Sequence, residues 1–309
     1  MNKNSSRRHY QELSIQGLRI LQWIVRRLPR WCGRLSMQIL FPLAYWGMRD
    51  LRQICTLNMQ RVYATTKTRQ DIAGMTHACL KTIATSMMDL IYFVDRPEKL
   101  AKIVHLHNEE HLQNALNVGK GVIGATAHLG NFPLLFVALA RKGYKVNVII
   151  RPMRDEQFSQ FVHDLCAQWN INMITTFPRK EFVRETLGAL RRNELLFILL
   201  DEVIAPSAGG VEVDFFNGTV TRAPGPMIFH ERMGSPVLPI FITQDERGNF
   251  NIFIEPALDV EARLAPDENT RRNIARLTAT IEKFVTQYPC QWGGWFNKKW
   301  LQQQTIQSS

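Results

Sequence analysis

A single histidine stands between two apolar runs in the segment 125–135, ATAHLGNFPLL. The residues before it, GKGVIGATA, predict a short buried strand, and those after it, LLFVALARKGY, carry apolar side chains at helical spacing. His128 is therefore expected where a strand ends and a helix begins, which makes it a candidate catalytic residue. Gly130 and Asn131 would allow close approach to the backbone, and the start of the helix would favour an oxyanion or a phosphate. The alternative for a lone histidine at a strand end is a structural role.

Polar residues gather at three further places near the ends of predicted strands. These clusters are 151–155, which includes Arg151 and Arg154; Asp201 with Glu202; and 217–222, which includes Gly218 and Arg222. Ligands of α/β sheets bind beyond the carboxyl ends of the strands. We therefore expect the clusters to converge with His128 on one site.

Arg151 follows an apolar strand, VNVIIRP. An arginine among apolar residues needs an anionic partner, and its planar guanidinium suits a carboxylate or a phosphate. Two partners are open: the phosphate of a substrate, or a carboxylate of the chain itself at Asp155 or Asp201.

Other chemistries have less support. His107 and His111 lie four residues apart in HLHNEEH, but no third metal ligand can be named, so a solvated helix face is the favoured interpretation. The five cysteines form no CxxC pair, and the GxSxG segment of serine hydrolases does not occur. We expect no metal and no other cofactor.

The elements that would position these residues alternate between strand and helix from residue 119 onward. This alternation predicts an α/β domain with a mostly parallel central sheet flanked by helices. The predicted strands are 121–127, 145–152, 171–177, 194–202, 211–216, 236–245 and 249–256. Helices are predicted between them and at the C-terminus, and residues 66–118 are predicted to form two helices, 68–93 and 97–119.

Residues 1–65 differ from the remainder, 66–309, and are predicted to form an amphipathic helical arm. The chain has a net charge of +11, and this arm holds eleven of its basic residues against two acidic ones. The uncharged run 35–48 has 14 residues and is interrupted by Pro42, whereas spanning a bilayer takes about 20 residues. Arginine interleaved with leucine and tryptophan favours a helix lying on an anionic membrane. A core-packing helix with solvated arginines is the alternative; a nucleic acid is disfavoured because of the apolar runs.

The segment AHLGNFP resembles the His-x4-Asp/Glu motif of the lysophospholipid acyltransferase superfamily. It is most similar to the bacterial branch of lipid A biosynthesis (lauroyl/myristoyl) acyltransferases. The segments IIRP, LLDE, VEVDFFNGTVTRAPGPMIFHERMGSPVLPIF and YPCQWGGWFNKKW resemble further motifs of that branch. Each is weak alone, but their order and spacing are fairly specific, and together they cover most of the chain.

This resemblance implies transfer of an acyl chain from an acyl-carrier-protein or coenzyme A thioester to a hydroxyl of a lipid A precursor, another glycolipid or a lysophospholipid. The expected place is the cytoplasmic face of a bacterial inner membrane. It further implies that His128 is the general base, that backbone N–H groups of the turn bind the oxyanion, and that Arg151 and Arg222 hold a phosphate.

One position departs from the family motif. The acid that would orient the histidine falls at residue 133, which here is proline. Proline cannot accept that hydrogen bond, although it suits the first turn of a helix. We expect Asp201 or Glu202 to take the place of the acid, with Asp201 preferred. The alternative is a non-catalytic lipid- or carrier-binding relative.

Overall fold

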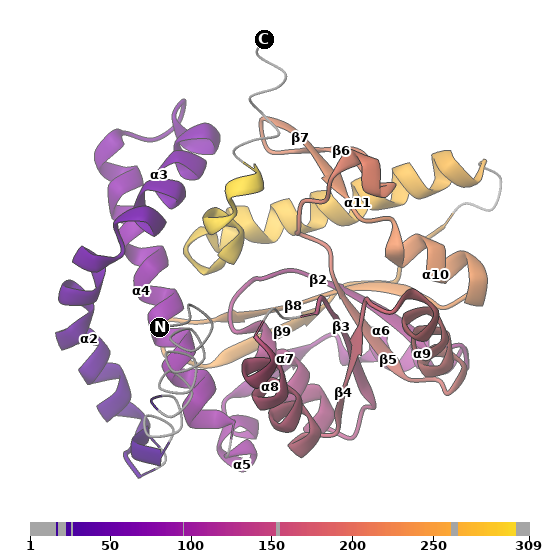
Figure 1. Ribbon diagram of the computed structural model, residues 1–309, viewed down its shortest axis with the longest axis horizontal. Coiled ribbons are helices and arrows are strands. Elements are labelled where there is room, and N and C mark those ends of the chain that lie inside the picture. Colours follow the sequence, from indigo (N-terminus) through magenta and orange to yellow (C-terminus); the bar gives the residue numbers. More distant parts are fainter. Residues whose placement is uncertain are drawn as a thin grey trace, which may run out of the picture.

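The computed structural model describes residues 17, 23–25, 27–94, 96–152, 155–260 and 265–300. Its centre is a seven-stranded sheet in the order β1-β9-β8-β2-β5-β3-β4 (Figure 1). The strands are β1 (Val104–His107), β2 (Val122–Thr126), β3 (Val146–Ile150), β4 (Ile171–Thr175), β5 (Leu195–Leu199), β8 (Val237–Gln244) and β9 (Phe250–Ile254). All neighbours are parallel except β8 and β9. A separate antiparallel hairpin pairs β6 (Val211–Phe215) with β7 (Gly218–Arg222). The predicted mostly parallel α/β sheet is confirmed.

Helices lie on both faces of the sheet and at one end of it (Figure 1). They are α2 (Arg30–Gly47), α3 (Arg49–Tyr63), α4 (Arg69–Phe93), α5 (Pro97–Ala101), α6 (Glu109–Leu116), α7 (Phe132–Arg141), α8 (Glu156–Gln168), α9 (Arg179–Arg191), α10 (Gly225–Met233) and α11 (Pro266–Gln287). Successive side chains of a strand point to opposite faces. In β5, Leu195 and Phe197 join the core beneath α7, whereas Leu196 and Ile198 join the core beneath α9, α10 and α11. Coverage on both faces explains why the sequences of β2 and β5 are almost wholly apolar.

The prediction of a single helix over residues 97–119 is wrong. This stretch forms α5, β1 and α6, because 104–107 pairs in parallel with β9 at the edge of the sheet. Asn108, in the left-handed conformation with φ 58°, separates β1 from α6. His107 bonds Asn251 and His111 bonds the carbonyl of Ile254, so these histidines do not share a solvated helix face. The second difference is β7, where residues 218–222 form a strand that the sequence prediction lacked.

Helices α2, α3 and α4 form a layer at one end of the sheet (left in Figure 1). Helix α2 continues across Pro42, so the proline does not end the helix. Arg30 donates to both oxygens of the buried Asp89 at 2.8 Å, and Arg34 donates to one of them at 3.3 Å. These two arginines of the predicted basic arm therefore attach it to the body of the protein.

The outward side of α2 is apolar. Its exposed large side chains are Trp31, Leu35, Ile39, Leu40, Leu43 and Trp46, preceded by Trp23, Ile24 and Leu28. Trp46 is 83% exposed and Leu43 is 75% exposed. Within the described ranges, none of the helices combines the length and apolar character that crossing a bilayer would require.

Candidate active site

His128 and Asp201 meet because of the register of two neighbouring strands. In the β2–β5 pair, Thr126 lies opposite Leu199, and each of the two polar residues comes two positions after its strand end. The Nδ1 of His128 lies 2.9 Å from Oδ1 of Asp201, and the backbone N–H of His128 donates to Oδ2 at 3.0 Å. The expected contact between these two side chains is confirmed.

Asp201 is buried, and both oxygens of its carboxylate accept hydrogen bonds. The indole N–H of Trp292 donates to Oδ2 at 2.8 Å, and Arg222 donates to the Asp201 carbonyl. A carboxylate with this many donors is held in one orientation. The Nδ1 of His128 is thus occupied, and the imidazole presents Nε2 to an incoming group.

The two members of this pair stabilise each other's charged forms. Burial disfavours the ionised carboxylate, but the charge and hydrogen bond of His128, and then Trp292, hold the pKa of Asp201 below its ordinary value. Burial would likewise lower the pKa of His128, but the charge and hydrogen bond of Asp201, and then the charge of Glu202, raise it above its ordinary value. His128 is thus suited to accept a proton and to hold it briefly as the imidazolium.

Residues 291–293 hold the turn after His128 in place through backbone hydrogen bonds. Gly130 donates to the carbonyl of Gln291 at 2.8 Å, Gly293 donates to the carbonyl of His128 at 2.7 Å, and Leu129 and Trp292 form an isolated β-bridge. Gly130 has φ +57°, and a Cβ there would run into the carbonyl of Ile242, so only glycine fits. Trp292 is the residue that sequence reasoning missed. The segment QW was recognised as a motif, but its contact with Asp201 is not visible along the chain.

Contrary to the prediction from the sequence, the amides of the turn are not available to bind an oxyanion. The N–H groups of His128, Leu129 and Gly130 donate to Asp201, Ala127 and Gln291, respectively. The Asn131 side chain is buried and donates to the carbonyl of Ser86 in α4. An oxyanion would therefore have to be met by other groups at the mouth of the cavity, since Pro133 has no N–H and the N–H of Leu134 donates to the carbonyl of Asn131.

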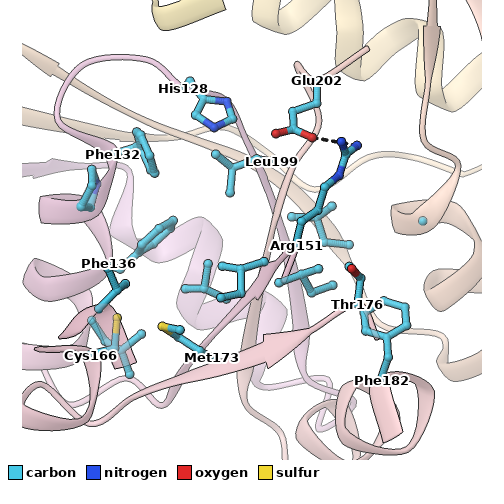
Figure 2. Close-up of a pocket in the computed structure, with 18 of the residues that line it drawn as sticks. His128, Phe132, Phe136, Arg151, Cys166, Met173, Thr176, Phe182, Leu199 and Glu202 are labelled. Atoms are coloured by element: carbon cyan, nitrogen blue, oxygen red, sulfur yellow. Dashed lines mark ion pairs between the residues drawn. The ribbon is translucent and has the colours of Figure 1, made fainter. Parts of the chain in front are cut away.

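Arg151 pairs with Glu202, with 2.8 Å between Nη2 and Oε2, and not with Asp155 or Asp201 (Figure 2). The two side chains are 53% and 41% exposed. Such an exposed pair contributes only about 0–1 kcal/mol, so an anionic ligand could replace the carboxylate at little cost. Arg154 lies outside the described residues.

Arg222 and Gly218 lie on the β6–β7 hairpin and do not line the cavity described below. Arg222 is 1% exposed and stacks over Phe215 with 4.6 Å to the ring centroid. Its Nε and Nη2 have no hydrogen-bond partner, and burial lowers its pKa to about 10. In this structure Arg222 holds the loop that carries Asp201 through the hydrogen bond to the Asp201 carbonyl. Direct contact of Arg222 or Gly218 with substrate stays a prediction.

A cavity of about 1340 Å³ opens beside His128. Arg151 and Glu202 lie at it as well, and most of its remaining lining is apolar (Figure 2). Pro133, in the first turn of α7, is part of the wall, whereas Gly130 and Asn131 are not. A large, mostly apolar cavity with a few polar groups suits a ligand with a long hydrocarbon chain.

Comparison with known proteins decides the family. Residues 1–302 match the family model described as bacterial lipid A biosynthesis acyltransferase. The chain belongs to this family. The resemblance read from the sequence motifs is thereby confirmed.

Two curated relatives of this acyltransferase family are similar over part of the chain. Both carry the name phosphatidylinositol mannoside acyltransferase and come from Mycobacterium tuberculosis, strains ATCC 25618 / H37Rv and CDC 1551 / Oshkosh. Each is 26% identical over 190 residues, which is 59% of this chain and 56% of the relative. The matched region thus spans little more than half the length of these relatives.

Within the acyltransferase family, the pairing of His128 with Asp201 bears on the missing motif acid. Pro133 begins the helix but offers no acceptor. The carboxylate that contacts the imidazole comes instead from the loop after β5. The structure thus places a carboxylate against the imidazole of His128, although this carboxylate comes from a distant part of the chain.

Proposed function

We propose that this protein transfers a fatty acyl chain from an acyl-carrier-protein or coenzyme A thioester to a lipid hydroxyl. The acceptor is a lipid A precursor, another glycolipid or a lysophospholipid. The observation that carries the proposal is the bonded His128–Asp201 pair at the edge of the 1340 Å³ apolar cavity. Family membership supports the reaction class.

In the proposed reaction, Nε2 of His128 takes the proton of the acceptor hydroxyl while its oxygen attacks the thioester carbonyl carbon. Collapse of the tetrahedral intermediate breaks the carbon–sulfur bond. The imidazolium then returns the proton to the leaving thiolate, which departs as a thiol. Asp201 keeps the proton on Nδ1 and stabilises the imidazolium between the two transfers.

Arg151 is proposed to bind a phosphate, either that of the acceptor or that of the donor's pantetheine arm. It lies at the cavity in an exposed ion pair that a phosphate could displace. Gly130, Asn131 and Arg222 would act indirectly, because they hold the backbone that carries His128 and Asp201.

The arm, residues 1–65, is proposed to place the enzyme on the cytoplasmic face of a bacterial inner membrane. The support is the row of exposed apolar side chains on α2 together with the basic charge of this part of the chain. Such a surface would suit anionic lipid, and the same positive charge would attract an acidic carrier protein.

The direct test is acyl transfer by the purified full chain from a radiolabelled palmitoyl carrier protein to lipids extracted from bacterial membranes. We expect a labelled lipid product with the wild type and a loss of at least about a hundredfold with His128→Ala, since general-base catalysis contributes roughly 10²–10⁴. Transfer that is undiminished in His128→Ala would contradict the mechanism. No transfer to any lipid would favour the non-catalytic lipid- or carrier-binding alternative.

A further inference from the structure

The cavity beside His128 extends over both faces of the sheet. Val148 and Leu199 point toward the core beneath α7, while Ile149 and Ile198, their neighbours along β3 and β5, point toward the core beneath α9 and α10. All four line the same cavity. The space therefore passes around the carboxyl ends of β3 and β5 and has two lobes.

Lobe 1 lies on the α7 and α8 side, and its wall includes Phe132, Phe136, Cys166 and Met173 (Figure 2). It begins at the imidazole, because the rings of His128 and Phe132 are in contact with 5.0 Å between centroids. In acyl transfer the chain is bonded directly to the carbonyl carbon that reacts beside His128. We therefore assign the transferred chain to lobe 1, because its wall begins at the imidazole.

Lobe 2 lies on the α9 and α10 side, and its wall includes Phe182, Val183, Gly225 and Phe229. The Arg151–Glu202 ion pair stands between it and the His128 end of lobe 1 (Figure 2). A Cβ placed on Gly225 would meet only Ile198, at 4.0 Å, so this part of the wall borders open space. Two exposed arginines, Arg179 and Arg232, also line the cavity beside lobe 2.

The size of the cavity exceeds what one chain needs. Pockets for a single small ligand commonly enclose about 300–1,000 Å³, and this one encloses about 1340 Å³. A second apolar compartment flanked by arginines suits a hydrocarbon chain that ends in an anionic group.

We propose that lobe 2 is a second hydrocarbon site, which holds a chain already present on an anionic acceptor lipid while lobe 1 holds the transferred chain. The inference rests on the proposed function and deepens it. The hydroxyl of such an acceptor reaches His128 past Arg151, and its anionic group lies near Arg179 and Arg232. The transferred and the resident chain thus lie on opposite faces of the sheet.

The test uses variants that fill one lobe at a time. Gly225→Leu and Val183→Phe fill lobe 2, and Met173→Trp fills lobe 1. Gly225→Ala is the matched control, because it carries the same backbone restriction before Pro226 without filling the space. Binding is measured by calorimetry with two probes, a palmitoyl-pantetheine phosphate thioether for the donor and lysophosphatidic acid for the acceptor.

We expect the wild type to bind lysophosphatidic acid even when saturated with the thioether. Gly225→Leu and Val183→Phe should weaken lysophosphatidic acid binding at least tenfold and leave thioether binding unchanged. Gly225→Ala should leave the binding of both probes unchanged. Met173→Trp should weaken only the thioether. Competition between the two probes would overturn the second site. So would lysophosphatidic acid binding by both lobe 2 variants that is as strong as that of the wild type. Failure of the thioether to bind the wild type would instead count against the proposed function.

A second experiment distinguishes the contribution of the lipid's hydrocarbon chain from that of its anionic group. Arg232→Gln should weaken lysophosphatidic acid severalfold but leave uncharged monopalmitoylglycerol unaffected. Equal weakening of both lipids, or of neither, would contradict the role of this arginine as the anion partner.

Discussion

Asp201 connects the chemistry to three distant parts of the chain. Its carboxylate bonds His128 after β2 and Trp292 near the C-terminus, and its carbonyl receives Arg222 from the hairpin. A base and the acid that orients it act as one unit, so their losses should not add.

We expect His128→Ala and Asp201→Asn each to lower kcat by about a hundredfold or more, and the double variant to lose little beyond either single one. Asp201 raises the pKa of His128, so removing its charge should lower that pKa. The acidic limb of kcat/KM in Asp201→Asn should therefore move to lower pH. Additive losses in the double variant, or an acidic limb that moves to higher pH, would show that Asp201 does not act through His128.

Trp292→Phe isolates a single hydrogen bond to Asp201. A hydrogen bond to a charged group contributes about 1.5–3 kcal/mol, so we expect kcat to fall about tenfold or more. Trp295→Phe is a matched control, since Trp295 belongs to the same aromatic cluster but donates to the carbonyl of Pro289. Both variants should lose similar thermal stability, and only Trp292→Phe should lose turnover. Equal kcat in the two would reduce Trp292 to a packing role.

Arg151→Ala should raise the KM for donor or acceptor while the midpoint of thermal unfolding stays nearly unchanged. The reason is that its pair with Glu202 is exposed and contributes about 0–1 kcal/mol. Arg141→Ala, which removes an exposed pair with Glu98 away from the cavity, serves as the control. A large loss of stability with normal kinetics would make the Arg151 pair structural.

At the scale of elements, α2 has two different faces. One face is tied to the body through Arg30 and Arg34, and the other exposes tryptophan and leucine to solvent. Deleting residues 1–50 would remove both faces and leave Asp89 without its arginines. Substitutions on the exposed face are therefore the cleaner test of membrane contact.

Replacing Trp31, Leu43 and Trp46 together by serine should weaken binding to anionic vesicles. Burying one such side chain contributes about 1.5–3 kcal/mol, so a loss of at least about tenfold in affinity is expected. The thermal midpoint should not fall, because these side chains are 64%, 75% and 83% exposed. Val118→Ser, at an exposed position outside α2, is the control. Unchanged vesicle flotation of the triple variant would show that α2 does not contact the membrane.

At the scale of the whole molecule, Asp89 holds the helical layer to the sheet. Its carboxylate, 2% exposed, accepts from Arg30, Arg34 and Gln244, so it joins α2, α4 and β8. Arg30 also stacks over Phe93. These contacts are long-range in sequence and depend on the complete fold.

Asp89→Asn should lower the free energy of unfolding by about 1–3 kcal/mol, because it leaves buried donors without a charged acceptor. Urea unfolding at neutral pH measures this difference. Glu98→Gln is the comparison: its side chain is 74% exposed, and its loss should change stability by less than about 0.5 kcal/mol. Equal midpoints for the two variants would show that the Asp89 network does not hold the layer in place.

The sequence by itself determined the strand–helix alternation, the mostly parallel sheet and the family. The first two follow from local patterns, namely apolar runs as in β2 and amphipathic repeats as in α7. The family follows from the resemblance of the motifs. The sequence also predicted that His128 and Asp201 lie together, since polar residues after parallel strands meet at one edge. It did not reveal β1, because a four-residue edge strand between two short helices has no periodicity of its own.

Only the tertiary structure decided which groups surround Asp201 and which carboxylate meets Arg151. Glu202, not Asp155 or Asp201, pairs with Arg151, and Trp292 reaches Asp201 across 91 residues of sequence. The two lobes of the cavity likewise depend on which helices cover each face of the sheet. Such contacts result from the register of strands and the packing of distant elements, and neither leaves a periodic signal along the chain.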